Sequence, residues 1–364
     1  MKNIILALFL LCSFANAEKA LLTLDSNSHD HTESCACETE CGCEDACACH
    51  NNAHAYAPIG VMGSHVHKKG QWMFSYRFMF MDMDGLRNGD SRTGDSENRG
   101  MGKYMMLPDD MSMKMHMLGM MYGVTDNLTL GLMIPWIEKD MDVRAGMSGS
   151  TSFRTRTDGI GDIKLNSMYK LWSDDQNNLL LNFGVSLPTG TVNEDGNNPM
   201  NPNGVTLGYP MQLGSGTVDF MPGLTFSGNN ENWGYGVQAI ATLRTHRNYR
   251  GYNKGNEIKF NTWISRKITK NFATSLRVEL NSWDDYEGHD DNLHGRRNMM
   301  PTADNDLRGG TRADAFLGFN YLFTDGVFKN SNIGIEVGMP FYQNIEGPNL
   351  ETDLILILGW QMTF

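Results

Sequence analysis

The sequence predicts an all-β protein: a twelve-stranded antiparallel transmembrane β-barrel with a disordered N-terminal segment. From residue 71 onward, alternate residues separate into an apolar set and a polar or charged set, which is the period of a β-strand. The connections between these segments are mostly short on one side and long on the other. Together, these features are typical of a barrel with lipid outside and a polar lumen inside.

Residues 1–17 have the features of a secretory signal peptide. Lys2 supplies the positive start, residues 4–11 form the apolar core, and Ala15 and Ala17 fit the small-residue cleavage site. The mature chain is therefore expected to leave the cytoplasm. The formal net charge of −12 argues against nucleic acid as a partner, because phosphate binding needs clustered cations.

Residues 18–58 form a Cys/His-rich segment that is polar, lacks periodicity and is expected to be largely disordered in the periplasm. Its candidate metal ligands are Cys35, Cys37, Cys41, Cys43, Cys47, Cys49, His29, His31, His50 and His54. Thiolates and imidazoles are ligands that Cu(I) and Zn(II) prefer. The alternative is that the six thiols pair as disulfides outside the cytoplasm, in which case binding by histidine could persist.

Residues 59–364 form the predicted barrel, which begins with strands over 71–83 and 111–122. In the first strand, Trp72, Phe74 and Tyr76 share an aromatic face, expected to meet lipid. The opposite, lumenal face of this hairpin carries Met79, Met81, Met83, Met111, Met113, Met115 and Met117. Thioethers bind Cu(I) and Ag(I), but methionine also fills apolar gaps. A soft-metal contact, an apolar lining for an organic solute and no specific role all stay open.

Ten further strands are predicted, over 128–136, 161–171, 179–187, 217–226, 233–244, 257–264, 272–281, 312–323, 332–341 and 354–364. Their charged residues fall on the lumenal face, because a charge facing lipid costs a few kcal/mol near the middle of the membrane. The expected lumen-lining residues are Arg77, Asp162, Lys164, Asp219, Arg244, Glu257, Lys259, Arg277, Glu279, Asp314 and Glu336. Ile355 and Ile357 are apolar at lumenal positions. They either pack against the N-terminal segment or form an apolar patch for a ligand.

Short turns are predicted at 123–127, 173–178, 227–231, 269–270 and 324–331, whereas the connections after the first, third, fifth and ninth strands run to twenty or more residues. Eight acidic residues crowd the first two long loops and the adjoining strand ends: Asp82, Asp84, Asp90, Asp109, Asp110, Glu138, Asp140 and Asp142. They form either a mouth that attracts cations or a solvated acidic surface.

The final strand ends in an aromatic residue, Phe364, preceded by Trp360 and alternating leucines. It resembles the C-terminal signal of bacterial outer-membrane proteins, and this implies recognition by the barrel-assembly machinery. Three motifs, at residues 159–163, 187–190 and 216–220, resemble the outer-membrane transporter family named after the meta-pathway of phenol degradation. That resemblance covers residues 60–364 and implies a barrel that passes small, often aromatic, molecules. The Cys/His segment and the methionines are not part of the family's general pattern.

No catalytic grouping can be argued from the spacing of the histidines, so no enzyme activity is expected. The leading expectation is an outer-membrane channel or transporter for a small solute in a Gram-negative bacterium. It would be linked to soft-metal handling through the Cys/His tail and the methionines. The alternatives are a metal-sequestering protein with the barrel as its anchor, and a channel for small aromatic or hydrophobic compounds. No cofactor is required, and Cu(I) or Zn(II) are the candidate ions. The expected partners are outer-membrane lipid, the assembly machinery, and a small solute or metal ion.

Overall fold

A computed structural model describes residues 52–99, 104–146, 148–198 and 201–364. Contacts divide the chain into residues 1–46 and residues 47–364, and the described residues all belong to the second unit. The six cysteines of the tail, together with His29, His31 and His50, lie outside the described residues. Their role as metal ligands therefore stays a prediction.

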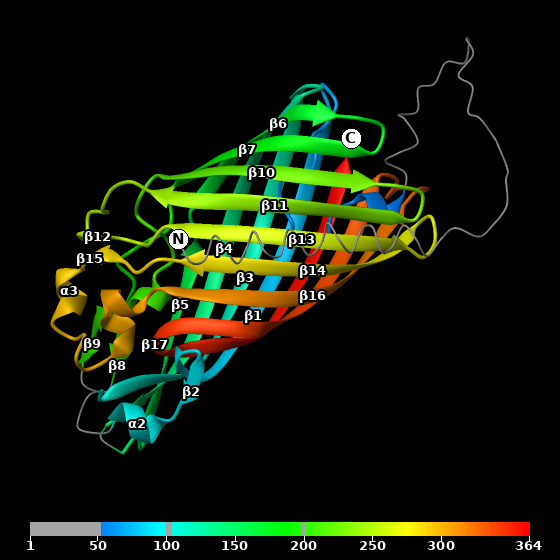
Figure 1. Cartoon of the computed structure of the whole chain (residues 1–364). Coiled ribbons are helices and arrows are strands. Elements are labelled where there is room, and N and C mark those ends of the chain that lie inside the picture. The colour runs from blue at the N-terminus through cyan, green and yellow to red at the C-terminus, as the bar shows by residue number, and fades with distance from the viewer. Residues whose placement is uncertain (1–51, 100–103, 147, 199–200) are drawn as a thin grey trace, which may run out of the picture. The chain divides into compact units, whose positions relative to one another are not determined.

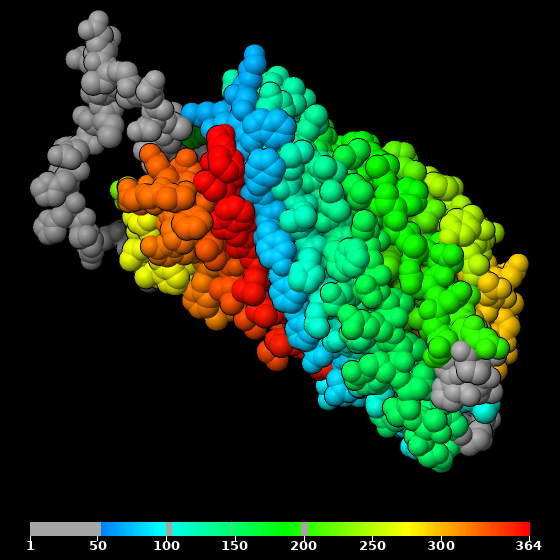
Figure 2. All heavy atoms as spheres, turned by 180° about the vertical axis from the view of Figure 1, so that it is seen from behind, coloured from blue at the N-terminus to red at the C-terminus, as the bar shows by residue number. Residues whose placement is uncertain are grey.

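The described residues form a closed antiparallel β-barrel, which confirms the predicted fold class (Figure 1). Its ring consists of β1 (Trp72–Gly89), β3 (Met106–Thr125), β4 (Leu128–Ala145), β6 (Ile163–Ser173), β7 (Asn177–Leu187), β10 (Asp219–Asn229), β11 (Trp233–Arg244), β13 (Glu257–Lys267), β14 (Phe272–Trp283), β16 (Gly310–Phe323) and β17 (Ser331–Thr363). Neighbours in the ring follow one another along the chain, and β17 closes it against β1. Figure 2 shows this seam, where the red last strand lies beside the blue first strand.

The strand count differs from the predicted twelve. In the described part of the chain, the barrel sheet has thirteen strands: eleven in the ring, with β2 (Ser91–Thr93) and β5 (Thr151–Ile160) attached outside it. The predicted strands 332–341 and 354–364 both fall within β17. Residues 331–345 of β17 pair with β16, and residues 345–363 pair with β1, both antiparallel.

The barrel wall is taller on one side than the sequence indicates. β1, β3 and β4 continue well beyond the predicted strand ends, and β5 pairs with the extended part of β4 where a long loop was expected. Hydrophobic periodicity could not reveal β5, because both of its faces are polar. Arg154 points outward and forms an ion pair with Asp142, whereas Thr155 and Thr157 are buried on the inner side.

The outer surface of the barrel is apolar, as the alternation predicts. Large apolar side chains are exposed at outward positions all around the ring, including Phe74, Leu118, Leu130, Trp136, Leu165, Phe183, Leu224, Leu276, Leu317, Val337 and Leu358. For a soluble protein, an exposed apolar belt of this extent would be exceptional. It is the surface that a barrel presents to lipid.

None of the described helices is long and apolar enough to span a membrane.

The two ends of the barrel differ. The short-turn end carries the tight connections between β3 and β4, β6 and β7, β10 and β11, β13 and β14, and β16 and β17. The long-loop end carries α2 (Asp95–Arg99), β8 (Asp195–Asn198), β9 (Asn201–Thr206), η4 (Tyr209–Met211), β12 (Tyr252–Asn253), β15 (Glu287–Gly288), α3 (Asp291–His294), η5 (Pro301–Ala303) and η6 (Asn305–Leu307). These short elements gather at the left in Figure 1.

Candidate functional site

The described residues before β1 fold into the lumen. Residues 53–70, here called the plug segment, begin at the short-turn end, where η2 (Ala53–Ala55) contacts β11, β13, β14 and β16. The plug segment also bonds to the inner face of several strands. Gln238 on β11 donates to the carbonyl oxygen of Met62, and Asn182 on β7 donates to that of Gly63, both over 2.7 Å. The segment returns to the short-turn end, where the Gly70 amide donates to Gly123. The lumen is therefore plugged from its short-turn side.

The tip of the plug segment, Ile59 and Gly60, is held at a buried ion pair. The Gly60 amide donates to Glu336 over 2.5 Å, and Arg77 donates to the Ile59 carbonyl over 2.9 Å. Glu336 in turn pairs with Arg277 over 2.8 Å, and each side chain is 1% exposed. A side chain at residue 60 would collide with this pair, because a Cβ there would lie 2.5 Å from Arg277 Nη2 and 2.6 Å from Glu336 Oε2. A larger residue at position 60 would therefore force the buried ion pair or the plug backbone to shift.

A cavity of about 580 Å³, the lumen cavity, lies on the other side of this tip. One side of it is apolar. We call Met79, Met81, Met115, Met117 and Met133 the methionine wall; Ile137, Phe316, Ile355 and Ile357 also line the cavity. Ile355 and Ile357 pack against Ile59 of the plug segment as well. The structure thus shows the expected packing of these two isoleucines against the N-terminal segment, and a ligand on the same apolar patch stays a prediction.

Strand register arranges six of the seven predicted methionines as a ladder of opposed pairs, and the seventh, Met117, lies opposite Arg77. Met79 lies opposite Met115, Met81 opposite Met113, and Met83 opposite Met111. Directly opposite side chains on one face have Cβ atoms about 4.5–5.5 Å apart. The ladder continues onto β4, where Met141 lies opposite Met111. The thioethers of Met83, Met111 and Met141 therefore form a row across three strands.

The ladder methionines nearest the long-loop end, Met83, Met111 and Met141, belong to an outer methionine cluster. This cluster comprises Met83, Met106, Met111, Met141, Met211, Met299 and Met300, packed with Val143 and Leu207. Met211 comes from η4, and the loop that carries it is fixed from below. Lys139 of β4 donates to the carbonyl oxygens of Pro210 and Gln212 over 2.7 and 2.8 Å.

The opposite side of the lumen cavity is a charged network on β10–β17. Arg277 pairs with Glu279 over 2.7 Å, and Lys259 pairs with Glu279 over 3.6 Å. Arg244 pairs with Asp219 over 3.4 Å. The lumen-lining residues predicted from the sequence thus lie together: nine of them line the cavity, and the remaining two, Asp314 and Glu336, are buried beside it as partners of Arg312 and Arg277.

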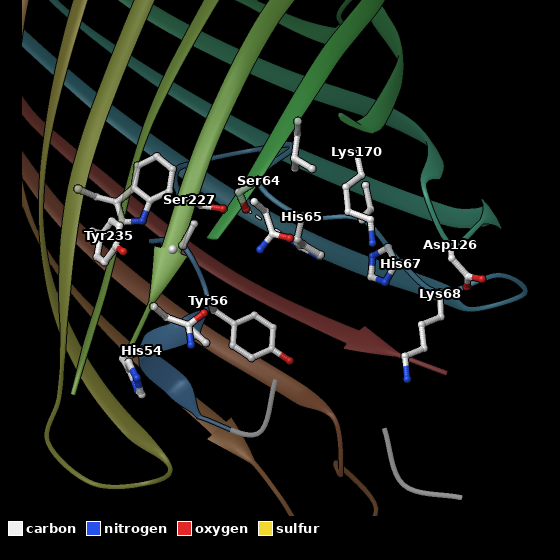
Figure 3. A pocket seen from close by; sticks show the side chains of 18 residues that line it. His54, Tyr56, Ser64, His65, His67, Lys68, Asp126, Lys170, Ser227 and Tyr235 are labelled. Atoms are coloured by element: carbon white, nitrogen blue, oxygen red, sulfur yellow. Dashed lines mark hydrogen bonds between the residues drawn. The ribbon is translucent and has the colours of Figure 1, made fainter. Parts of the chain in front are cut away.

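A second cavity of about 550 Å³, the inner vestibule, lies at the short-turn end below the plug tip. Figure 3 shows its lining, which comes from the plug segment (His54, Tyr56, Ser64, His65, His67, Lys68) and from the strands and turns around it (Asp126, Lys170, Ser227, Tyr235). The His65 and His67 rings are 4.9 Å apart, edge to face. His54, a predicted metal ligand, is buried, and its Nε2 lies 2.9 Å from the Asn230 carbonyl oxygen.

The described residues contain no group of three or more His, Cys, Asp or Glu side chains placed to hold a metal ion. That finding does not extend to thioethers or to the cysteine tail. Sequence reasoning missed the plug tip, together with Arg312 and Phe316 in the cavity lining. The closely spaced Pro58, Gly60 and Gly63 were the available signal for an unusual backbone path.

A family model and one solved structure agree with this architecture. The family model described as "Putative MetA-pathway of phenol degradation" matches residues 110–343. The solved COG4313 outer membrane channel from Pseudomonas putida F1 aligns at a TM-score of 0.56 and 12% identity, covering 83% of this chain and 98% of that one. A Pseudomonas aeruginosa FadL homologue aligns at 0.40 and 13% identity, covering 87% and 93%. No curated protein sequence matches the chain.

At such low identity, the structural likeness shows the fold alone and transfers no solute. The family match is a separate finding, because it spans more than half of the sequence, from β3 to β17. The apolar belt, the closed antiparallel ring and this match lead to one identification. The chain belongs to the family described as the "Putative MetA-pathway of phenol degradation", a family of outer-membrane β-barrels.

Proposed function

We propose that the protein is a gated channel that passes a small, largely apolar solute across the outer membrane. The observation that carries this proposal is the methionine wall in a lumen cavity of about 580 Å³. Pockets of roughly 300–1,000 Å³ with apolar linings are the usual size for small organic ligands. The family description, which refers to phenol degradation, and the channel neighbours point to transport of such molecules and not to catalysis.

The plug segment is the gate in this proposal. Gly60 and Met62 line the lumen cavity, whereas residues 54–57 and 64–68 line the inner vestibule. The plug tip therefore separates the two spaces, and a solute passes only when the tip moves. The inner vestibule faces the periplasm, because short turns are periplasmic in outer-membrane barrels. The N-terminal tail then begins on the periplasmic side.

We count twelve passes through the membrane in this proposal. All pairings in the ring are antiparallel, so β17 must reverse direction between the part that pairs with β16 and the part that pairs with β1. β17 then supplies two passes, and the ten other ring strands supply one each. We further propose that the last pass, which ends at the exposed Phe364, is read by the barrel-assembly machinery.

The test is uptake of a radiolabelled neutral aromatic, toluene, by cells with and without the protein. Expression should raise the uptake rate, because lipopolysaccharide slows the entry of apolar solutes. Met115→Asp, which places a charge in the methionine wall, should abolish the gain. The matched variant Met115→Leu keeps an apolar wall and should retain it. Equal uptake with and without the protein would refute the proposed passage.

A second candidate function is soft-metal handling, favoured by the row of Met83, Met111 and Met141 in the outer methionine cluster. Three adjacent thioethers suit Cu(I) or Ag(I). This candidate ranks second because a bare cation moving inward would meet Arg77 and Lys164 in the lumen cavity. The cysteine tail is a further candidate site, for Cu(I) or Zn(II), and a sequestering protein with the barrel as its anchor stays a prediction.

Metal binding is tested with Ag(I) on the full-length protein, on a version without residues 18–57, and on the double variant Met111→Leu/Met141→Leu. Binding by the barrel should persist without the tail and disappear in the double variant. Leucine preserves apolar packing, so toluene uptake should not change. If neither the full-length nor the shortened protein binds Ag(I), Cu(I) or Zn(II), metal handling is excluded and the organic-solute channel stands.

A further inference from the structure

One cation in the lumen cavity borders the methionine wall. Lys164 on β6 lies directly opposite Met133 on β4, and on its other side it lies opposite Ser186 on β7. All three residues line the lumen cavity. Because directly opposed side chains are close neighbours, the Lys164 ammonium can reach the edge of the apolar wall. An apolar ligand on Met117 and Met133 would thus have one positive charge at its end.

The charged network on β10–β17 pairs its carboxylates with cations other than Lys164. The carboxylates of Asp219, Glu257 and Glu279 are each within ion-pair distance of Arg244, Lys259 or Arg277. Asp162, two residues before Lys164, accepts hydrogen bonds from the amides of Gly190 and Ser215 instead. Within the described part of the chain, Lys164 forms no ion pair with a carboxylate.

The other charged residues that line the lumen cavity are one carboxylate, Asp284, and three cations, Lys254, Arg77 and Arg312, the last of which pairs with Asp314. Lys254 and Asp284 both line the cavity near the long-loop end, one of each sign. Arg77 lines it near the plug tip, where it donates to the Ile59 carbonyl oxygen. Two cations therefore border the methionine wall, Arg77 opposite Met117 and Lys164 opposite Met133, and Arg77 is already bonded to the plug tip.

We propose that Lys164 and the methionine wall form a binding site for an amphipathic anion. The ligand has a flat or chain-like apolar body and a single carboxylate or sulfonate. The body packs on Met117 and Met133, and the anionic group accepts a hydrogen bond from Lys164. An ionic hydrogen bond strengthens in a poorly hydrated site, so the anion outcompetes a neutral analogue, and a cation is repelled. This inference rests on the proposed passage of an apolar solute and specifies its class.

The experiment measures binding to full-length protein in lipid nanodiscs by calorimetry. The probes are benzenesulfonate and phenyltrimethylammonium, which share a ring and carry permanent charges of opposite sign, together with neutral benzyl alcohol. Empty nanodiscs give the background from lipid partition. Benzenesulfonate should bind roughly tenfold more tightly than benzyl alcohol, the factor that one hydrogen bond to a charged group contributes. Phenyltrimethylammonium should bind more weakly than either.

Two variants locate the effect. Lys164→Gln should remove the roughly tenfold preference for benzenesulfonate, because that preference comes from one charge-assisted hydrogen bond, so that benzenesulfonate and benzyl alcohol bind about equally. The matched control is Lys114→Gln. Lys114 lies on β3 between two methionines of the ladder, so its side chain is on the opposite face of the strand, and it lines neither cavity. It should leave the preference intact.

The outcomes separate this inference from the proposed function. Equal binding of the three probes to the unmodified protein would overturn the anion site and would leave passage of an apolar solute standing. That comparison needs no variant, so it holds even if Lys164→Gln fails to fold. A preference that survives in folded Lys164→Gln would also overturn the assignment to Lys164. If none of the three ring compounds binds above background, the proposed function fails together with the inference.

Discussion

The two sides of the lumen use the same strand geometry for opposite chemistry. On β1, β3 and β4, inward positions carry the methionine ladder. On β13, β14 and β16, equivalent inward positions carry Glu257, Lys259, Arg277, Glu279 and Arg312. The alternation of side chains along each strand places both sets inside the barrel. It does not decide how the side chains of each set interact. The charged side is held by directional ion pairs, whereas the methionine side is held by packing among flexible side chains.

The difference assigns a mechanical role to each side. The charged side fixes the plug tip, because Glu336 binds the Gly60 amide and is itself bound by Arg277. The guanidinium of Arg277 also lies over the Phe316 ring, 3.7 Å from its centroid. The methionine side contacts the same tip through apolar packing on Ile59 and through one hydrogen bond, from Arg77 on β1 to the Ile59 carbonyl oxygen. The methionine side chains can change rotamer around a solute without breaking an ion pair.

The largest expected effect is from Arg277→Leu on the charged side. It leaves Glu336 and Glu279 with less compensation in a buried setting, and breaking a buried pair in this way costs about 3–5 kcal/mol. The free energy of unfolding, measured by urea titration in lipid vesicles, should fall by that amount. The double variant Arg277→Leu/Glu336→Leu should recover much of the loss, because no uncompensated Glu336 charge is left. A loss under 1 kcal/mol for the single variant would contradict the fixed role of this pair.

On the methionine side, the free energy of unfolding should depend on the volume of the side chain and not on its thioether group. Met141 is 2% exposed in the outer methionine cluster, so Met141→Ala should lower the free energy of unfolding by about 2–5 kcal/mol. Met141→Leu conserves volume and should cost less than about 1.5 kcal/mol. The same urea titration measures both. Equal losses for alanine and leucine would show that the thioether itself, and not packing, stabilises the cluster.

The contrast between the two sides was partly visible in the sequence. Alternation placed Met79, Met115, Arg277 and Glu279 on one face of their strands, since a period of two depends only on local residue order. It also placed the β11 boundaries correctly, at Trp233 and Arg244. A barrel with one apolar and one charged lumenal side could therefore be predicted.

Two features lay beyond sequence reasoning for physical reasons. β5 stands above the apolar belt, where neither face needs hydrophobic residues, so it shows no apolar alternation. The plug segment is held by hydrogen bonds from strands far away in the chain, such as Gln238 to Met62. A backbone carbonyl carries no sequence signature, so residues 53–70 give no sign of their partners, although Pro58, Gly60 and Gly63 indicate an unusual backbone path.

The plug tip contacts both sides of the lumen, and Gly60→Val should displace it. The new side chain collides with Arg277, Glu336 and Ile357, and overpacking of this kind costs about 1–3 kcal/mol. In the proposed gate, part of this strain is relieved by displacement of the tip. Ion conductance in planar bilayers should then rise. The control Gly295→Ala has no neighbouring atom near its new Cβ and should conduct like the unmodified protein. Unchanged conductance in Gly60→Val would argue against the tip as the gate.

The smallest effect is expected from an ion pair that resembles the one at Arg277 in chemistry but not in setting. Arg154 on β5 pairs with Asp142 over 2.6 Å, and its side chain is 65% exposed. Water and salt screen such a pair, and exposed pairs typically contribute about 0–1 kcal/mol. Arg154→Leu should therefore change the free energy of unfolding by less than about 1 kcal/mol, and added salt should shrink even that difference. A loss as large as that of Arg277→Leu would mean that charge pairing as such, and not burial beside the plug, makes one side of the barrel rigid.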